Sequence, residues 1–369
     1  MNTEKALSTK TPALNAGVFF KEEHEEKHED SWKESMRSAF KNSLALEVFL
    51  NQKIAQTSFP LFVPHKLAKK IKNLGPMSAL WKQFIPSHLE NNSSGLIDPI
   101  GDQKHSQGSQ IIHRYQNRVL FMPTSVCPVM CRYCFRKNEL TENLDFLTPD
   151  FEKTLQYLNS HTEINEVIFS GGDPFILTDE KLDFYLSAFS KIPHLKYIRF
   201  HTRTPIVMPE RVTAGLIEVL TRHQASFSKL FIALHINHME ELDPEVEDAI
   251  CRLSEHRIEL LSQTVLLKGI NDDVSTLKEL LETLVDMNVR PYYLHHPDPV
   301  KGGSHFMLTL KEGRTIYGKL RDLLPGWALP QYIIDIPEGF GKVLAFNGES
   351  LDFGGYLLSR ELKTIPYKA

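Results

Sequence analysis

The chain has 369 residues, which is enough for one large α/β domain with additions or for two ordinary domains. Hydrophobic residues make up 41% and charged residues 24%, a composition typical of globular proteins, so wholesale disorder is excluded. The formal net charge is −4, and the sequence contains no basic block, which argues against a nucleic-acid partner.

The cellular compartment can be predicted from the cysteines and from the apolar segments. No apolar run has the length of a signal peptide or a membrane span, so neither export nor a membrane partner is expected. Of the four cysteines, three fall within eight positions, which suits a metal site in a reducing compartment better than a disulfide framework. We therefore expect a cytoplasmic protein.

The N-terminal part divides into two predicted segments. Residues 1–30 are polar and lack hydrophobic periodicity, so we expect a disordered, solvated tail. Residues 31–110 are predicted to be a helical region that is broken at Pro60 and Pro64 and followed by a linker. Residues 91–112, which are rich in Asn, Ser and Gly, read as that extended linker.

From Arg118 onward, short apolar segments alternate with amphipathic stretches that resemble helices. The predicted strands are Val119–Met122, Val167–Phe169, Tyr197–Phe200, Leu230–Leu234, Leu260–Leu267 and Pro291–Leu294. Their spacing of about 30 to 40 residues favours a parallel sheet with right-handed crossovers, either doubly wound or curled towards a barrel. We assign residues 111–300 to this α/β domain.

Residues 301–369 form the predicted C-terminal segment. It contains one expected helix at Lys311–Leu324 and two short strand candidates at Tyr332–Ile336 and Val343–Phe346.

Polar motifs follow most of the predicted strands. They are the cysteine loop, the turn Ser170–Pro174, His201–Arg203, His235–His238 and His295–Asp298. In parallel α/β folds the functional sites lie at the carboxyl ends of the strands, so these motifs are expected on one rim.

The strongest chemical signal is the Cys-x₃-Cys-x₂-Cys spacing of Cys127, Cys131 and Cys134. Thiolates are soft ligands, and three on one loop can hold three irons of a 4Fe-4S cubane while the fourth iron stays open to a substrate. Structural zinc is the alternative, but it prefers four protein ligands. Cys251 is interpreted as a small buried hydrophobe inside a helix. The spacing thus predicts a cluster that cleaves S-adenosylmethionine to a radical.

A glycine turn follows the next predicted strand. Gly171 and Gly172 let the backbone approach a ligand closely, and Asp173 can accept a hydrogen bond from an ammonium group. Such a turn is more often simple punctuation between elements. Its place one β-α unit after the cysteine loop favours binding of the methionine amino group of S-adenosylmethionine.

Two arginines and a lysine suggest a second cofactor, and two acids suggest a cationic substrate. Arg114 and Arg118 could bind a phosphate, and Lys342 follows glycines, so its amine could form a Schiff base. Each feature alone is usually surface charge, but together they are what pyridoxal phosphate requires. Asp298 and Asp335 would select a cation if both pointed into one pocket, although an isolated Asp more often caps a turn.

The order of these motifs resembles the lysine 2,3-aminomutase family of radical S-adenosylmethionine, pyridoxal-phosphate enzymes. The match runs from Ile111 to Lys342. Its carriers are His113–Tyr115, Arg118–Phe121, Cys127–Arg136, Ser170–Asp173, Arg203–Pro205, His235–His238, Gln263–Asp272, Pro291–Leu294, His305–Phe306, Asp335 and Lys342.

This resemblance implies residue roles for three cofactors. The three cysteines would ligate the 4Fe-4S cluster, and Ser170–Asp173 would hold S-adenosylmethionine. Lys342 would carry pyridoxal 5′-phosphate, with Arg114 and Arg118 near its phosphate. For the substrate, the resemblance implies that Arg136 pairs with the carboxylate.

The family's two acids for the ε-ammonium of lysine match Asp298 and Asp335. Relatives that act on glutamate replace these acids, so their presence favours lysine. The implied reaction is an isomerisation of L-lysine to β-lysine, in which a 5′-deoxyadenosyl radical takes hydrogen from C3 and the amino group migrates from C2 to C3.

The implied fold is a partial (β/α)₆ barrel with an N-terminal helical extension and a C-terminal capping segment. An electron donor protein and a homo-oligomer are further implied partners beside the small-molecule amino acid.

Some features leave alternatives open. Glu338 and Phe340 interrupt the glycine run before Lys342, and no cysteine follows Cys251, so the C-terminal zinc cluster of the clostridial type is not expected. The segment 293–307 is similar to the branch that modifies elongation factor P, whereas Asp335 is closer to the metabolic branch. The remaining hypotheses are an aminomutase for arginine or glutamate, a non-catalytic metal-binding homologue, and a radical enzyme without pyridoxal phosphate.

Overall fold

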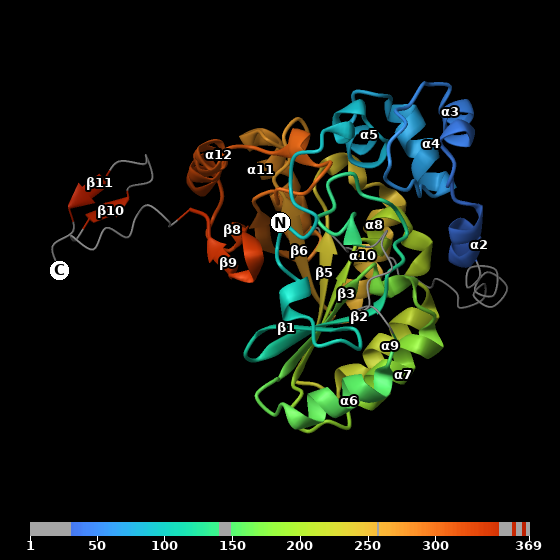
Figure 1. The fold of residues 1–369 in the computed structure, drawn as a ribbon, viewed down its shortest axis with the longest axis vertical. Coiled ribbons are helices and arrows are strands. Elements are labelled where there is room, and N and C mark those ends of the chain that lie inside the picture. Colours follow the sequence, from blue (N-terminus) through green and yellow to red (C-terminus); the bar gives the residue numbers. More distant parts are fainter. Residues whose placement is uncertain (1–30, 140–148, 257, 347–355, 359–363, 367–369) are drawn as a thin grey trace, which may run out of the picture.

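The computed structural model describes residues 31–139, 149–256, 258–346, 356–358 and 364–366. The tail predicted at residues 1–30 lies outside the described residues. Within these ranges, nine strands form one curved sheet in which the spatial order follows the chain order from β1 to β9 (Figure 1). The last two short strands, β10 (Tyr356–Leu358) and β11 (Thr364–Pro366), pair only with each other.

The centre of the large sheet is parallel. Its strands are β2 (Arg118–Thr124), β3 (Glu166–Gly171), β4 (Tyr197–Thr202), β5 (Lys229–His235), β6 (Glu259–Val265), β7 (Val289–His295) and β8 (Gln331–Ile336). Two antiparallel strands, β1 (Ile111–Tyr115) and β9 (Gly341–Leu344), form the edges. All six strands predicted for the α/β domain are confirmed, and so is the fold class, a partial barrel.

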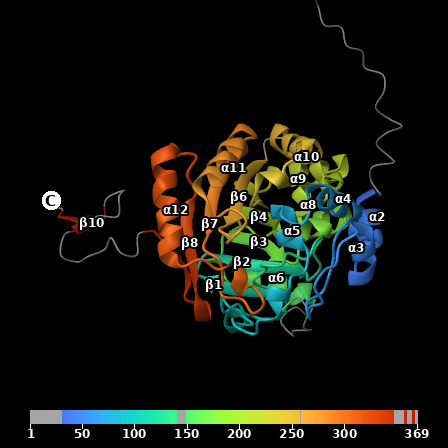
Figure 2. The same cartoon turned by 90° about the horizontal axis from the view of Figure 1, so that it is seen from above.

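Helices follow the parallel strands and cover the convex side of the sheet, as Figure 2 shows from above. They are α6 (Phe151–Ser160), α7 (Asp179–Phe189), α8 (Thr204–Val207), α9 (Ala214–Gln224), α10 (Pro244–Glu255), α11 (Val274–Asp286) and α12 (Leu310–Leu323). The six longer helices begin at an Asp or Thr whose side chain accepts a backbone N–H of the first turn. These caps are Asp150, Thr178, Thr213, Asp243, Asp273 and Thr309.

Successive side chains along each strand point alternately to the hydrophobic core under the helices and to the interior of the barrel. On β4, Ile198 and Phe200 belong to the hydrophobic core against the helices, whereas Arg199 and His201 line the interior cavity. The same alternation on the neighbouring strands places other polar side chains inside the sheet's curve. The parallel sheet therefore holds its functional groups on one concave face.

In the described part of the chain before the barrel, four helices form a layer: α2 (Ser31–Ser38), α3 (Ser43–Leu50), α4 (His65–Leu74) and α5 (Ala79–Phe84). They share a hydrophobic core of their own that includes Trp32, Leu46 and Phe84. Val207, the last residue of α8, and Met208, which follows it, belong to the same core. The predicted N-terminal helical extension is thus packed onto the barrel near α8, beside the cysteine loop.

Two predictions from the sequence are wrong. Residues 91–112 were predicted to be a linker, yet Ile111–Tyr115 form the edge strand β1, because Ile111 and Ile112 are buried against β2. Cys251 does lie in a helix, α10, but it is exposed. The helix buries the adjacent Ile250, and a step of one residue turns a side chain by about 100°.

In the part of the chain that the structure describes, no helix combines the length and the apolar character that a bilayer crossing requires.

Candidate active site

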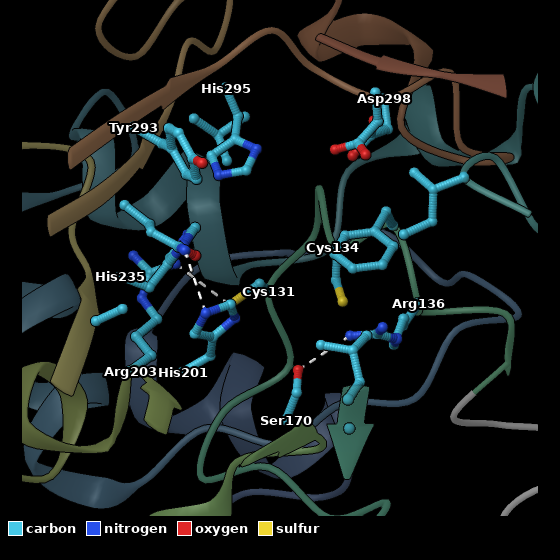
Figure 3. Close-up of a pocket in the computed structure, with 18 of the residues that line it drawn as sticks. Cys131, Cys134, Arg136, Ser170, His201, Arg203, His235, Tyr293, His295 and Asp298 are labelled. Atoms are coloured by element: carbon cyan, nitrogen blue, oxygen red, sulfur yellow. Dashed lines mark hydrogen bonds between the residues drawn. The ribbon is translucent and has the colours of Figure 1, made fainter. Parts of the chain in front are cut away.

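One cavity fills the interior of the partial barrel, and Figure 3 shows part of its wall. Its lining includes residues from β1 to β9 and from the cysteine loop. Every site residue predicted from the sequence lies on this wall: Arg114, Arg118, Cys127, Cys131, Cys134, Arg136, Ser170, Gly171, Gly172, Asp173, Asp298, Asp335 and Lys342. The fold therefore brings together motifs that are spread over more than two hundred positions of the sequence.

The cysteine loop follows β2 and rests on the N-terminal helical layer. The backbone N–H of Met130 donates to the carbonyl of Phe62 at 3.0 Å, and that of Arg132 donates to the carbonyl of Gln83 at 2.8 Å. The Arg132 guanidinium also pairs with the fully buried Glu90 at 2.5 Å. These contacts fix the loop from the side opposite to the cavity.

The three thiols fit a cluster of iron ions. Burial, and the nearby cysteines after it, raise the pKa of Cys127 well above its usual value and that of Cys134 to about 12. Three neighbouring thiolates therefore require a positive partner, which an iron cluster supplies. No three His, Cys, Asp or Glu side chains among the described residues are placed to hold a single metal ion.

The glycine turn after β3 allows close contact with the start of the cysteine loop. Gly171 has φ +100°, and a Cβ at Gly172 would lie 2.1 Å from the carbonyl oxygen of Val126. The N–H groups of Gly172 and Asp173 donate to the carbonyls of Thr124 and Val126, both at 2.8 Å. The two glycines are thus required by the backbone packing that positions the cysteine loop.

We expect Gly172→Ala to cost the protein most of its iron after cluster reconstitution, because the new methyl group must push the Val126 backbone away. Iron content per chain, read beside the circular dichroism spectrum, checks this result. Gly326→Ala is the matched control, since a Cβ there meets no atom within 4 Å. Full iron content in the Gly172 variant would refute this role of the turn.

The carboxylate of Asp173, which was predicted to contact an ammonium group, accepts four hydrogen bonds from within the protein. One carboxylate oxygen accepts from Phe175 N at 3.0 Å and Thr202 Oγ1 at 2.6 Å, and the other accepts from Arg203 N at 2.6 Å and Thr204 N at 2.9 Å. Both oxygens are therefore occupied. The carboxylate joins the turn after β3 to the end of β4, which favours a positioning role for Asp173.

Next to the cysteines, the predicted motif His235–His238 is joined to Tyr133, which was given no role from the sequence. Asn237 Nδ2 donates to the Tyr133 hydroxyl at 2.6 Å, and this hydroxyl is 2.7 Å from Nε2 of His235. Burial and the charge of Arg203 lower the pKa of His235 well below its usual value, so its ring is neutral. Tyr133 stands between two cluster cysteines, which is the signal that could have identified it.

The opposite side of the cavity carries a buried acid that the sequence analysis missed. Asp102 is 1% exposed, accepts from Arg114 Nη2 at 2.6 Å and forms an ion pair with Arg136. Arg136 Nη1 also donates to Ser170 Oγ at 3.2 Å (Figure 3). One carboxylate therefore fixes two of the three arginines that were predicted from the sequence as anion ligands.

The two arginines keep unused donors that fit anionic groups. Nε of Arg114 and Nε of Arg136 are buried and have no hydrogen-bond partner. Such orphaned donors are rare in folded proteins and suit a phosphate or a carboxylate. Arg118 also faces the cavity, where its guanidinium lies 3.9 Å from the centre of the Tyr115 ring. Arg199 of β4, which the sequence analysis did not select, adds another guanidinium to the wall.

Lys342 is positioned by the β8–β9 hairpin. The register places it opposite Asp335, and its Nζ lies 2.8 and 3.0 Å from the two carboxylate oxygens. Its backbone N–H donates to the Tyr115 hydroxyl at 2.8 Å. Although Glu338 interrupts the glycine run, it adopts φ +64° itself, so the turn forms and directs the amine into the cavity.

Asp298 lies on the loop after β7, on the cavity wall (Figure 3). Burial, and then the charge of Asp335, raise its pKa to about 7. His295 nearby is uncharged, because burial and the Lys342 ammonium lower its pKa to about 3. Two carboxylates that repel each other define a place for a cation, and one of them, Asp335, is already paired with Lys342.

A partial barrel with three cysteines on the loop after its first parallel strand defines a radical S-adenosylmethionine enzyme. In agreement, the profile of the Radical SAM superfamily matches residues 121–284.

Curated relatives define the family. The chain is 36% identical to the L-lysine 2,3-aminomutase of Haemophilus influenzae over 292 residues, which are 79% of this chain and 86% of that protein. It is 36% identical to that of Escherichia coli over 294 residues, with shares of 79% and 85%. For that of Methanococcus maripaludis, the identity is 38% over 278 residues, with shares of 74% and 63%. The chain therefore belongs to the L-lysine 2,3-aminomutase family, whose members are isomerases.

A solved structure is also similar. SuiB of Streptococcus suis bound to the precursor peptide SuiA matches 60% of this chain and 48% of its own, with a TM-score of 0.44 and 16% identity.

Proposed function

We propose that this protein converts L-lysine to β-lysine by moving the amino group from C2 to C3. The observation that carries the proposal is the charge pattern of one cavity. Asp298 and Asp335 provide a site for the side-chain ammonium, while Arg136 offers to the carboxylate a buried Nε that has no hydrogen-bond partner. A substrate with a cation at one end and a carboxylate at the other fits this pattern.

The family implies a 4Fe-4S cluster, S-adenosylmethionine and pyridoxal phosphate. When bound, the cluster and S-adenosylmethionine supply a 5′-deoxyadenosyl radical, and pyridoxal phosphate supplies the carrier for the migrating amino group. We assign Cys127, Cys131 and Cys134 to the cluster and the backbone of Ser170–Gly172 to S-adenosylmethionine. Lys342 would hold pyridoxal phosphate, with Arg114 and Arg118 close to its phosphate.

The chain's own residues bind and orient the substrate. Asp102 holds Arg136 in place, so the carboxylate of lysine meets a guanidinium that is already oriented. Apolar side chains of the wall, among them Leu120 and Ile168, help to keep water out of the cavity. Fixed geometry and exclusion of water are the protein's contribution to a radical reaction.

Lysine binding should depend on pH through Asp298. A cation requires the ionised carboxylate, and the pKa of Asp298 is raised to about 7. We expect the KM for lysine to rise as the pH falls below about 7, by roughly tenfold for each pH unit, because the ionised fraction of Asp298 falls by that factor. Steady-state kinetics across this range measure the change. In Asp298→Asn the KM should be high and flat, and a flat profile in the wild type would contradict the role of Asp298.

Glutamate is disfavoured as a substrate, because its side-chain carboxylate would meet Asp298 and Asp335. Arginine carries a cation and therefore remains the competitor of lysine in the test. A non-catalytic homologue would bind metal without cleaving S-adenosylmethionine.

The remaining assignments are also proposals. A low-potential electron donor protein would reduce the cluster, and a reducing cytoplasm would protect it, which agrees with the unpaired cysteines. The edge strand β9 and its turn expose Phe340, Val343 and Leu344, which supports a homo-oligomer. We also propose that the chain after its N-terminal tail is divided into the three regions predicted from the sequence, at residues 31–110, 111–300 and 301–369.

The reaction is tested anaerobically with the reconstituted, reduced protein, S-adenosylmethionine, pyridoxal phosphate and L-lysine. We expect β-lysine, and we expect its loss when any one component is omitted. Formation of 5′-deoxyadenosine without β-lysine would overturn the substrate, and absence of both products would overturn the reaction class.

A further inference from the structure

Arg203 connects β4 to the cysteine loop. It directly follows Thr202, the last residue of β4, and its side chain is 5% exposed. Its Nη1 donates a hydrogen bond to the sulfur of Cys131 at 3.3 Å and also contacts the Tyr133 hydroxyl. Figure 3 shows Arg203 beside Cys131 on the same side of the pocket. A buried charged donor thus lies against one of the three cysteines.

The other end of the guanidinium is held rigidly. Nη2 of Arg203 donates to Glu241 at 2.6 Å and to Gln83 Oε1 at 2.8 Å. Glu241 is 2% exposed and accepts from the backbone N–H groups of Asn237 at 2.8 Å and His238 at 3.0 Å. Because these partners come from the N-terminal layer and from the loop after β5, Nη1 cannot turn away from the sulfur without breaking several buried bonds.

The three cysteines are not equivalent in this respect. The side chain of Arg203 acts on Cys131 with both its charge and a hydrogen bond, whereas Cys134 receives a backbone N–H from Arg136. Pairing with Glu241 alone would not require an arginine, because a lysine could do the same. Only a forked guanidinium can donate to the Glu241 carboxylate and to the Cys131 sulfur at the same time.

A charged donor at a cluster ligand changes the energy of electron uptake. The reduced cluster carries one more negative charge than the oxidised cluster, so a nearby guanidinium stabilises the reduced form more strongly. The effect is enlarged in a buried site, where the effective dielectric constant is low. Hydrogen bonds to cluster sulfurs are one of the means by which proteins set reduction potentials.

We propose that Arg203 sets the reduction potential of the cluster through its hydrogen bond to the Cys131 sulfur, and so makes reduction of the enzyme easier. The proposal rests on the proposed ligation of the cluster by Cys127, Cys131 and Cys134. The step that it affects is the transfer of one electron from a low-potential reductant to the oxidised cluster, in which no covalent bond forms or breaks.

The test is a redox titration of the reconstituted full-length protein, followed by electron paramagnetic resonance, with dithionite as reductant and without substrate. Two variants remove the contact in different ways. Arg203→Lys keeps the charge for Glu241 but loses the fork. The double variant Arg203→Gln with Glu241→Gln removes both charges, so no unpaired carboxylate stays buried. Arg211→Lys is the control, because Arg211 is also buried and donates to Asp179 and to backbone carbonyls.

We expect both Arg203 variants to bind a normal amount of iron and to be harder to reduce. The equilibrium constant for one-electron reduction should fall about tenfold, which corresponds to a potential lower by about 59 mV. The Arg211 control should titrate like the wild type.

An unchanged potential in both Arg203 variants would overturn the proposal while leaving the cluster in place. Loss of iron from both variants, with a normal circular dichroism spectrum, would also overturn it, because Arg203 would then hold the loop and not tune the cluster. Absence of a cluster signal from the wild type would instead refute the proposed function itself.

Discussion

Lys342→Ala is expected to abolish β-lysine formation, with a loss of at least about 10³-fold, as is typical when a covalent catalytic group is removed. Lys342 is the lysine that the described cavity wall presents, and its amine lies 2.8 Å from the carboxylate of Asp335. Folding should survive, because Arg114 Nη1 still lies 3.6 Å from the Asp335 carboxylate. The variant should also lose the visible absorption of bound pyridoxal phosphate.

The matched control for this substitution is Lys104→Ala. Lys104 pairs with Glu338 on the exposed side of the same turn, at 3.3 Å. It should keep both the absorption and the activity. If Lys342→Ala retained the absorption band and produced β-lysine at the wild-type rate, the assignment of Lys342 would be wrong.

Cys134→Ser is expected to eliminate cleavage of S-adenosylmethionine, with 5′-deoxyadenosine falling by at least about 10³-fold, because a hydroxyl is a poor ligand for a cluster that needs thiolates. Iron and sulfide content should fall with the activity. Both quantities are measured after anaerobic reconstitution.

The same substitution at Cys251 provides the control. Cys251 is exposed on α10 and lies outside the cavity lining, so Cys251→Ser should bind iron and cleave S-adenosylmethionine like the wild type. Wild-type iron content in Cys134→Ser, or a loss of iron in Cys251→Ser, would contradict the assignment of the cluster ligands.

The parallel strands and the position of the site could be predicted from the sequence because both have local signals. Each buried strand that was predicted reads as a short apolar run, and most of them are followed by a polar motif at the carboxyl end. The spacing of Cys127, Cys131 and Cys134 is also local, since one loop carries all three. Such features need no knowledge of tertiary contacts.

The parts that were missed depend on tertiary contacts. Asp102 lies in a polar segment without periodicity, and its role is visible only when Arg114 and Arg136 meet it in space. Asp335 and Lys342 are seven residues apart, and only the register of the β8–β9 hairpin places them opposite each other.

One further misreading, and one set of contacts that local sequence could not reveal, have a similar origin. Strand β1 had a weak signal in the pair Ile111–Ile112, which the preceding Gly- and Ser-rich segment obscured. For Asp173, the sequence identified a carboxylate next to a glycine turn, but the four hydrogen bonds that occupy it come partly from β4 and the residues that follow it. Local patterns indicate which groups are polar, whereas the packing of the sheet decides what they bind.

The most direct test of lysine 2,3-amino migration is a competition assay with L-lysine, L-arginine and L-glutamate at equal concentrations. The reconstituted wild-type protein is reduced anaerobically with S-adenosylmethionine and pyridoxal phosphate, and each β-amino acid is separated by chromatography from the α-amino acid of the same mass. The charge pattern of Asp298, Asp335 and Arg136 predicts β-lysine as the dominant product. A dominant β-arginine or β-glutamate, or 5′-deoxyadenosine without any β-amino acid, would contradict it.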